Sequence, residues 1–312
     1  MMGKTLIGID VGGTTIKAGI VDGDGRLLQT SETPTPSQES AEVGVQRIAD
    51  QARQLVDQAG VSWSSVEGVG IGLPGFLDIP QGKIVKLVNI PWTDIAIKDR
   101  LEEELNVPVT IDNDANAAAF GEAWIGAGRG LGDLVCITLG TGIGGGMISG
   151  GKLIHGSSGL AGEIGHIRVE ENGAICGCGR QGCVETIASA TGMIRLAKES
   201  ILSGEHTKLA SKAKNDQLMA KDIFDAASEG DPVAQKVIAV AVDALARMMS
   251  ILSVVTNPAA FIIGGGVSRA GEQLLAPLRQ AYAAYTFADA RILPAELGND
   301  AGIIGAARLT VQ

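Results

Sequence analysis

The chain has 312 residues, of which 25 are basic and 35 acidic, so its formal charge at pH 7 is -10 and its pI is near 4.9. This balance argues against binding to the phosphate backbone of nucleic acid and against attraction to an anionic membrane. Hydrophobic residues make up 45% of the sequence, which can fill one large core or two moderate ones, and we expect two domains. With neither a signal-peptide pattern nor an uninterrupted apolar run of about 18 residues, we expect a cytoplasmic protein.

The first 127 residues have a mixed α/β pattern. Residues 4–30 predict a series of hairpin strands, residues 39–59 have the apolar spacing of a helix, and residues 66–75 resemble a buried strand that ends in a loop. A loop with two prolines is expected next. It is followed by a helix over 95–105, a strand over 107–111 and a helix that begins near Asp114.

A second unit is expected to begin near residue 133, because the sequence from there repeats the plan of the N-terminus. At an offset of 128 residues, Gly12 aligns with Gly140 and Ile20 with Ile148. This similarity predicts an internal duplication, although chance similarity between two glycine-rich hairpins is the alternative.

The rest of the chain continues the α/β pattern. Residues 186–256 are expected to be mainly helical, residues 259–268 form a strand and a glycine turn that opens a helix, and a last strand and helix follow residue 289.

Three of the four cysteines form a compact pattern: His166, nine further residues, then Cys176-x-Cys178-x4-Cys183. In a reducing compartment such a cluster indicates a metal or redox chemistry. There is no C-x-x-C motif, which disfavours redox chemistry. Three thiolates and one imidazole are the ligands of a closed, four-coordinate zinc site, and a site with every position filled is structural. The remaining Cys136 is expected in the core.

Three glycine turns, at residues 10–15, 139–146 and 262–268, could bring backbone N–H groups close to an anion. The second turn contains G-x-G-x-x-G, but it leads into another strand, so it does not fit a dinucleotide-binding motif, and no Walker motif occurs. Two phosphate-binding hairpins remain, with a third turn that could contact a nucleoside.

The segment "IGIDVGGTTIKAGIVD" resembles the first phosphate loop of the superfamily of sugar kinases, actin and heat-shock ATPases. The resemblance implies a two-lobed α/β, ribonuclease H-like (actin/hexokinase-type) ATPase fold with a structural zinc site. The small lobe would be residues 1–115, completed by 299–312, and the large lobe, with the zinc loop, residues 116–298. Asp10 would act through Mg²⁺ on ATP; from the residues alone it could equally cap a turn.

The segments "ITLGTGIGGGMISGGKLIHGSSGLAGEIGH" and "CGCGRQGCVE", together with "GLPG" and "DNDANAAAFGE", resemble the ROK family of repressors, open reading frames and sugar kinases, in its bacterial glucokinase branch. The resemblance implies an ATP-dependent kinase for the 6-hydroxyl of glucose. Other sugars (N-acetylmannosamine, allose, mannose or fructose) and polyphosphate as the donor stay open. A sugar-sensing repressor is disfavoured, because only about nine residues precede the "DVGGT" strand.

The resemblance also implies the site. Asp114 would be the catalytic base, although its position also suits a helix N-cap. The further residues expected to bind the sugar are Gly75, Asn89, Asn113, Glu163, His166 and Glu185. The residues expected to bind ATP and Mg²⁺ are Asp10, Gly12, Gly13, Thr14, Thr15, Lys17, Thr138, Gly140, Thr141, Gly142, Gly264, Gly265 and Gly266. Asp112, His155 and His206 are given no catalytic role. Assembly as a homodimer or larger is expected from the family.

Overall fold

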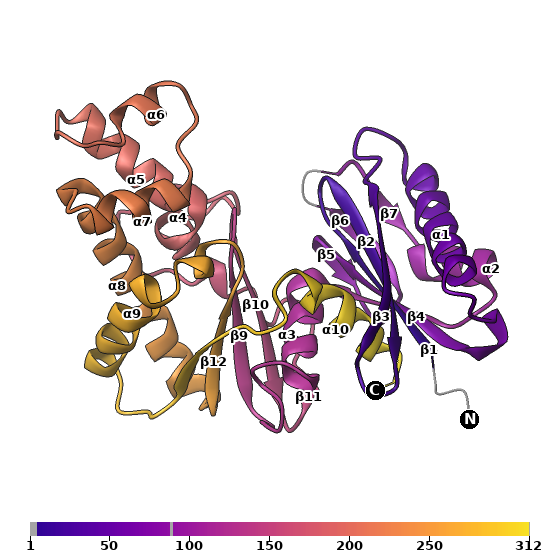
Figure 1. Ribbon diagram of the computed structural model, residues 1–312. Coiled ribbons are helices and arrows are strands. Elements are labelled where there is room, and N and C mark those ends of the chain that lie inside the picture. Colours follow the sequence, from indigo (N-terminus) through magenta and orange to yellow (C-terminus); the bar gives the residue numbers. More distant parts are fainter. Residues whose placement is uncertain (1–4, 88–89, 312) are drawn as a thin grey trace. The chain divides into compact units, whose positions relative to one another are not determined.

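The computed structural model describes residues 5–87 and 90–311 (Figure 1). The chain forms two compact units, each built from more than one segment. Unit 1 comprises Met1–Gly132, Gly146–Gly162 and Glu296–Gln312, and unit 2 comprises Asp133–Gly145 and Glu163–Ala295.

The sheet of unit 1 has the strand order β3-β2-β1-β4-β8. Its strands are β1 (Thr5–Val11), β2 (Thr15–Asp22), β3 (Leu27–Pro34), β4 (Val66–Leu73) and β8 (Val109–Asn113). The hairpin strands β1, β2 and β3 are antiparallel, as predicted, whereas β1, β4 and β8 run parallel. The carboxyl ends of these three parallel strands therefore lie at one edge of the sheet, where ligands bind in open α/β sheets.

Side chains alternate between the two faces of this sheet. Ile7, Ile9 and Val11 of β1 belong to a core cluster that includes the buried face of helix α1 (Ala41–Gln58) and reaches α2 (Ile97–Leu105). The predicted helices over 39–59 and 95–105 are thereby confirmed.

The opposite face of the sheet is lined with glycine where helix α10 (Ala301–Leu309) packs on it. Gly19, Gly8 and Gly70 are neighbours across β2, β1 and β4. A Cβ atom at Gly8 would lie 1.8 Å from the Ile303 carbonyl oxygen, and one at Gly70 would lie 1.7 Å from that of Ala306. The sequence placed the glycines in turns, but these glycines lie within strands, where they let a helix backbone approach the sheet.

Helix α3 (Asp114–Trp124) packs closely against α10. A Cβ atom at Gly305 would lie 1.6 Å from the Ala117 carbonyl oxygen, and one at Gly121 would lie 2.5 Å from that of Ala301. Residues 116–132 and 146–162 belong to unit 1, whereas the predicted large lobe included them. The compact units therefore divide the chain differently from the predicted lobes.

Glu122, on α3, is only 1% exposed. Its carboxylate accepts backbone N–H bonds from Ala127 (2.9 Å), Glu296 (3.2 Å) and Leu297 (2.8 Å). One buried carboxylate thus joins two chain segments of unit 1 that are about 170 residues apart in sequence.

Between β4 and α2, the expected loop is wrong. Residues 75–95 contain a three-stranded sheet of β5 (Gly75–Asp78), β6 (Lys83–Leu87) and β7 (Thr93–Ile95). The strands are three to five residues long, and Pro80 and Pro91 lie in the connections between them. The prolines indicated turns correctly, but the strands between the turns are too short to predict from their sequence.

The second sheet has the order β11-β10-β9-β12-β13. Its strands are β9 (Leu134–Leu139), β10 (Ile143–Ser149), β11 (Lys152–Leu153), β12 (Ala260–Gly264) and β13 (Arg291–Pro294). The boundary between the units falls within β10. Strand for strand, this order matches the first sheet, with β9 in the place of β1 and β10 in that of β2. The matching order supports duplication over chance similarity.

Unit 2 is otherwise mainly helical. Its helices are α4 (Glu185–Ala188), α5 (Ala190–Leu202), α6 (Ala210–Lys214), α7 (Ala220–Ser228), α8 (Pro232–Thr256) and α9 (Glu272–Tyr285). Short 3-10 turns occupy Ile164–His166 and Val267–Ala270 in unit 2, and Trp63–Ser65 and Gly298–Asp300 in unit 1. By length and composition α8 could cross a membrane, but it packs against α5, α7 and α9, as a core helix does.

Candidate active site and metal centre

The junction of β8 and α3 places Asp114 at the carboxyl edge of the first sheet. Asn113 is the helix N-cap, since its Oδ1 accepts N–H bonds from Ala115 (2.9 Å) and Asn116 (3.3 Å). Asp114 is therefore the first helical residue, partly exposed, and the N-cap alternative for this carboxylate falls away.

Gly72 brings two strand ends together at this edge. It pairs with Asp10 on β1 and with Asp112 on β8. A Cβ atom at Gly72 would lie 3.4 Å from the Asp114 Cα atom and 3.8 Å from Asp10 Oδ1. The absence of a side chain on β4 thus leaves Asp10 and Asp114 as neighbours, within one unit.

Burial raises the pKa of Asp10 to about 6, while the nearby Lys17 ammonium acts in the opposite direction. Its carboxylate lies against Gly302, in the first turn of α10, where a Cβ atom would be 2.6 Å from Oδ2. A carboxylate that is costly to ionise without a partner suits a cation such as Mg²⁺, which favours the ionised form.

The turn between β1 and β2 is braced at its base and open at its tip. The Gly12 N–H donates to the Thr15 carbonyl (2.9 Å), and Thr35 donates its hydroxyl to Gly12 (2.7 Å) and its N–H to Thr14 (3.0 Å). Gly13 and Thr14 are exposed. This is a rigid hairpin with an accessible tip, which a phosphate-binding turn requires.

The turn between β9 and β10 is braced in a similar way. The Gly140 N–H donates to the Gly142 carbonyl (3.0 Å), and the start of α5 secures the turn: the Ala190 N–H donates to Gly140 (2.8 Å) and the Thr191 hydroxyl to Thr141 (2.7 Å).

The third turn, Gly264–Gly266, lies against the same strand. Gly264 pairs with Thr138. Gly265 has φ +85°, and a Cβ atom there would lie 2.4 Å from the Leu139 carbonyl oxygen. Two of the three predicted nucleotide turns therefore meet at the carboxyl end of β9, within unit 2.

The structure brings the four predicted metal ligands together. One ligand atom from each of His166, Cys176, Cys178 and Cys183 falls within 4.8 Å of all the others. Cys178 Sγ lies 3.7 Å from Cys183 Sγ, and Cys176 Sγ lies 3.5 Å from His166 Nδ1. A tetrahedral zinc ion with Zn–S bonds of about 2.3 Å and Zn–N bonds of about 2.0 Å separates its ligands by about 3.5–3.8 Å. The donor set and its spacing therefore fit zinc.

Burial raises the pKa of the Cys176 thiol to about 12 and also raises that of Cys183, whereas a hydrogen bond from the Arg180 backbone lowers that of Cys178. A bound cation would favour the thiolate at all three.

The loop around these ligands has little regular structure. Two isolated bridges, Arg168 with Cys183 and Ile175 with Gln181, hold it together. Gly182 has φ +80°, and a Cβ atom there would lie 1.8 Å from the Glu170 carbonyl oxygen, so only glycine fits.

Two carboxylates flank the cluster. His166 turns Nδ1 toward Cys176 and places Nε2 3.6 Å from Glu163 Oε2. Glu185 accepts the Ile143 N–H (2.9 Å) through Oε2, while the Cys176 thiol lies 3.5 Å from its Oε1. Glu163, His166 and Glu185, predicted as sugar ligands, therefore all border the metal centre within unit 2.

The remaining predicted sugar residues are less constrained by the structure. Gly75 begins β5 with φ +128°, a backbone conformation that favours glycine. Asn89 lies outside the described residues.

Sequence reasoning missed a buried polar pair beside Asp114. Asp112 is 1% exposed, and its Oδ2 lies 2.6 Å from His155 Nε2. The two residues are 43 positions apart, and neither belongs to a motif that points to the other. A signal was available only in the placement of a carboxylate directly after the strand predicted over residues 107–111.

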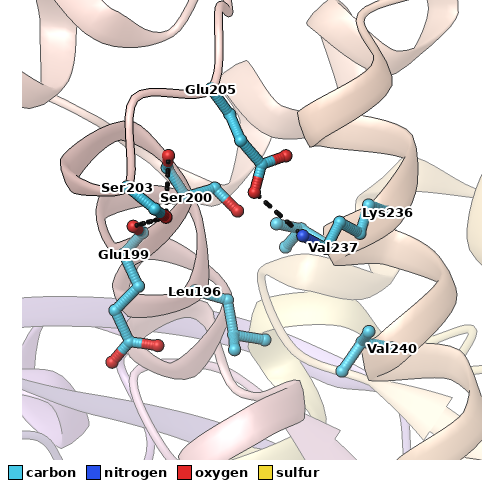
Figure 2. A pocket seen from close by; sticks show the side chains of 8 residues that line it. All are labelled: Leu196, Glu199, Ser200, Ser203, Glu205, Lys236, Val237 and Val240. Carbon is cyan, nitrogen blue, oxygen red and sulfur yellow. Dashed lines mark hydrogen bonds and ion pairs between the residues drawn. The ribbon is translucent and has the colours of Figure 1, made fainter.

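A pocket of about 240 Å³ lies between α5 and α8 (Figure 2). It is lined by Leu196, Glu199, Ser200, Ser203, Glu205, Lys236, Val237 and Val240. Lys236 donates to Glu205 (2.9 Å), so its charge is paired. None of the predicted site residues lines this pocket.

Known proteins resemble this chain in sequence and in fold over nearly its whole length. The profile of the ROK family matches residues 6–312. The glucokinase of Halalkalibacterium halodurans is 43% identical, over 100% of this chain and 96% of its own length. The N-acetylmannosamine kinase of Escherichia coli is 34% identical, over 98% of each chain. A crystal structure of a ROK family glucokinase from Streptomyces griseus with glucose and AMPPNP superposes with a TM-score of 0.81 at 40% identity, covering 98% of each chain.

Proposed function

This chain belongs to the ROK family, and we propose on that basis that it transfers the γ-phosphoryl group of ATP to the 6-hydroxyl of glucose, giving glucose 6-phosphate. It is a glucokinase by its full-length similarity to enzymes of that activity. The observation in the molecule that carries the proposal is the β8–α3 junction, where the N-cap residue Asn113 fixes the start of the helix and leaves Asp114 to serve as the base.

Asp114 would accept the proton of the 6-hydroxyl as its oxygen attacks the γ-phosphorus. Phosphoryl transfer asks little covalent chemistry of the protein, so the value of this carboxylate lies in orienting the hydroxyl and accepting its proton. Asn113 uses its amide oxygen as the helix cap, so we propose that its NH₂ group contacts the sugar.

Glu163, His166 and Glu185 are proposed to bind sugar hydroxyls. His166 would use Nδ1 for the metal and Nε2 for the sugar, an arrangement in which each ring nitrogen has one partner. Glu185 holds the Ile143 N–H with one oxygen, which orients its carboxylate. Gly75 and Asn89 are retained as sugar contacts from the family resemblance.

A zinc ion held by His166, Cys176, Cys178 and Cys183 would be structural, since four protein ligands leave no position for water. It would stabilise a loop that has little regular secondary structure, although backbone hydrogen bonds such as that from the Cys176 N–H to the Arg180 carbonyl (2.7 Å) cross it. The catalytic contribution of this loop then comes from Glu163 and Glu185, whose positions depend on the loop being closed.

ATP is proposed to bind through the three glycine turns, and Mg²⁺ through Asp10 and the nucleotide. The cation would neutralise charge on the β- and γ-phosphates. The proposed nucleotide residues are those predicted from the sequence, with the braced hairpin tips at Gly13–Thr14 and Gly140–Gly142 as the phosphate-binding parts.

ADP release with ATP·Mg²⁺ would be measured against glucose, mannose, fructose, allose, N-acetylglucosamine and N-acetylmannosamine, with Asp114→Asn in parallel. A preference for glucose that the variant abolishes is expected. The 34% identity to an N-acetylmannosamine kinase makes that sugar the second candidate, and turnover confined to it would replace glucose in the proposal. Polyphosphate in place of ATP tests the donor.

We further propose that the protein is a cytoplasmic homo-oligomer that binds neither nucleic acid nor membrane. Ile251, Val254 and Val255, near the end of α8, are 44%, 67% and 74% exposed, and contiguous apolar surface of this kind often marks an interface. Light scattering coupled to gel filtration is expected to give a dimer or larger, and Val254→Glu to lower the mass.

A further inference from the structure

We propose that His155 and Asp112 act together as a positioning pair for the catalytic base, so that His155 sets the rate of phosphoryl transfer although it contacts neither substrate. The inference rests on the proposed role of Asp114. It follows from the hydrogen bonds of Asp112 within unit 1, one of which joins the β8–α3 junction to His155 in the loop after β11.

The first part of the argument is the position of Asp112. It is the fourth residue of β8, two residues before Asp114, and it is almost wholly buried. Both of its oxygens are engaged: Oδ1 accepts from the Asn113 N–H (2.7 Å) and from Asn116 Nδ2 (2.8 Å), and Oδ2 faces His155 Nε2 (2.6 Å). Asp112 thus connects the end of β8 to the first turn of α3, and Asp114 lies between these two points.

The second part is charge. A buried carboxylate is stable only when it is paired and hydrogen-bonded. Among the described residues, His155 is the titratable side chain within ion-pair distance of Asp112. The hydrogen bond to Asp112 raises the pKa of the His155 imidazole above its ordinary value. A larger fraction of His155 is therefore protonated and forms an ion pair with the Asp112 carboxylate.

The third part is that Asn116 is also committed to this carboxylate. Its amide NH₂ donates to Asp112, whereas its Oδ1 is buried and has no hydrogen-bond partner in the part of the chain that the structure describes. An asparagine that leaves its own oxygen unsatisfied while donating to Asp112 indicates that fixing Asp112 matters more than the cost at Asn116.

The fourth part is where His155 comes from. It begins a loop between β11 and the 3-10 turn Ile164–His166, and the loop is closed by an N–H bond from Ala161 to the His155 carbonyl (3.1 Å). Its side chain is 30% exposed. The loop therefore places one imidazole against the buried carboxylate. In many hydrolases a buried carboxylate orients a histidine, whereas here the histidine orients the buried carboxylate.

The test compares His155→Ala with His155→Gln, whose amide can still donate to Asp112. Misplacing a reacting group by about 1 Å can cost a hundredfold in rate, so we expect His155→Ala to lower kcat by about tenfold or more. KM for glucose and for ATP should stay within about threefold, and His155→Gln should recover most of kcat, because the hydrogen bond is what positions Asp112. His206→Ala, at an exposed histidine of unit 2, is the matched control and should leave kcat unchanged.

Each outcome decides the matter. A parent enzyme inactive with every sugar would sink the proposed function, whereas an active parent with a fully active His155→Ala would sink only this inference. Equal losses in both variants, or a loss confined to KM, would also overturn it. Should His155→Ala fail to fold, Asp112→Asn replaces it: loss of kcat there with activity kept in His155→Gln supports the pair, and any other pattern contradicts it.

Discussion

The β8–α3 junction and the cysteine loop both hold carboxylates for the proposed reaction, but they do so by different means. At the junction, a strand, a helix cap and a buried hydrogen-bond network fix Asp114. In the loop between Glu163 and Glu185, turns, two isolated bridges and scattered backbone hydrogen bonds take the place of longer helices and strands, and four ligand side chains converge on one point. We expect the first region to be stable through backbone geometry and the second to depend on the proposed zinc ion.

The difference shows that preorganisation does not need regular secondary structure. It needs every group next to the reactive one to have a partner, whether the partner is a backbone N–H group or a metal. The two regions should consequently respond differently to the same kind of perturbation, and four experiments can separate them.

The largest effect is expected at the junction itself. Asp114→Asn removes the proton acceptor, and loss of general-base catalysis costs about 10²–10⁴-fold in rate. Because Asn113 retains the helix cap, the melting temperature should change little. Steady-state kinetics with thermal unfolding checks both parts; a melting temperature that falls together with kcat would mean that Asp114 has a structural role.

In the cysteine loop, the metal should matter more than any hydrogen bond. Removing zinc with a chelator, or replacing Cys178 by serine, is expected to lower kcat/KM for glucose by about 10–100-fold, as loss of ligand orientation does at metal sites. Metal content by atomic emission, kinetics, and recovery on adding Zn²⁺ provide the measurement. Cys136→Ala, in the buried strand β9, is the control that should retain the metal. Full activity in a zinc-free protein would contradict the proposed structural role.

At Asp10, function and stability should oppose each other. The folded-state pKa of about 6 lies above the ordinary 3.8, so the folded protein binds more protons between these values, and stability falls as the pH rises through that window. Without Mg²⁺ and nucleotide, Asp10→Asn should raise the free energy of unfolding at pH 7.5 by up to about 3 kcal/mol.

That gain should shrink toward zero as the pH approaches 4, while kinase activity is lost at every pH. Denaturant unfolding at several pH values checks the sign, with the exposed Asp57→Asn as a control that should show no such trend. A destabilised Asp10→Asn at pH 7.5 would mean that the carboxylate is stabilised by partners other than a cation.

The smallest effect tests how Glu185 is oriented. A Cβ atom at Gly142 would lie 2.4 Å from Glu185 Oε2, so Gly142→Ala must displace that carboxylate, whereas a Cβ atom at Gly140 would have no atom within 4 Å. Gly142→Ala should raise KM for glucose by about three- to tenfold, the equivalent of about 1 kcal/mol. Gly140→Ala should not. Equal effects of both substitutions would place the defect in phosphate binding instead.

Much of the fold could be predicted from the sequence. The strands β1 and β4 consist of alternating or continuous apolar residues, and the apolar residues of α1 have the spacing of a helix. The clustering of His166 with Cys176, Cys178 and Cys183 was predictable as well, since the spacing of these residues is local. The sheet over residues 75–95 was missed, because its strands are too short to show a period. The sequence did not indicate that α10 packs on Gly8 and Gly70, since only the register across strands places these two glycines side by side.

The Asp112–His155 pair and the Glu122 contacts were missed for a related reason. Each joins residues far apart in the chain through one side chain, and neither a period nor a motif records such a contact. Position in the motif favoured Asp114 over Asp112, but only the structure shows why the two carboxylates differ: Asp112 has both oxygens engaged in the interior, and Asp114 lies at the surface of the sheet edge.

The packing of α10 on Gly8 and Gly70 limits the order in which parts of the protein can fold during synthesis. During synthesis, β1 and β4 leave the ribosome more than 200 residues before α10, so the part of the first sheet that α10 covers stays open until translation reaches residue 309. Residues 163–295 form most of unit 2 without interruption and can fold earlier. Deleting the last dozen residues should therefore leave nascent chains that need a chaperone, even though Asp114 and every other residue proposed for the site is already present.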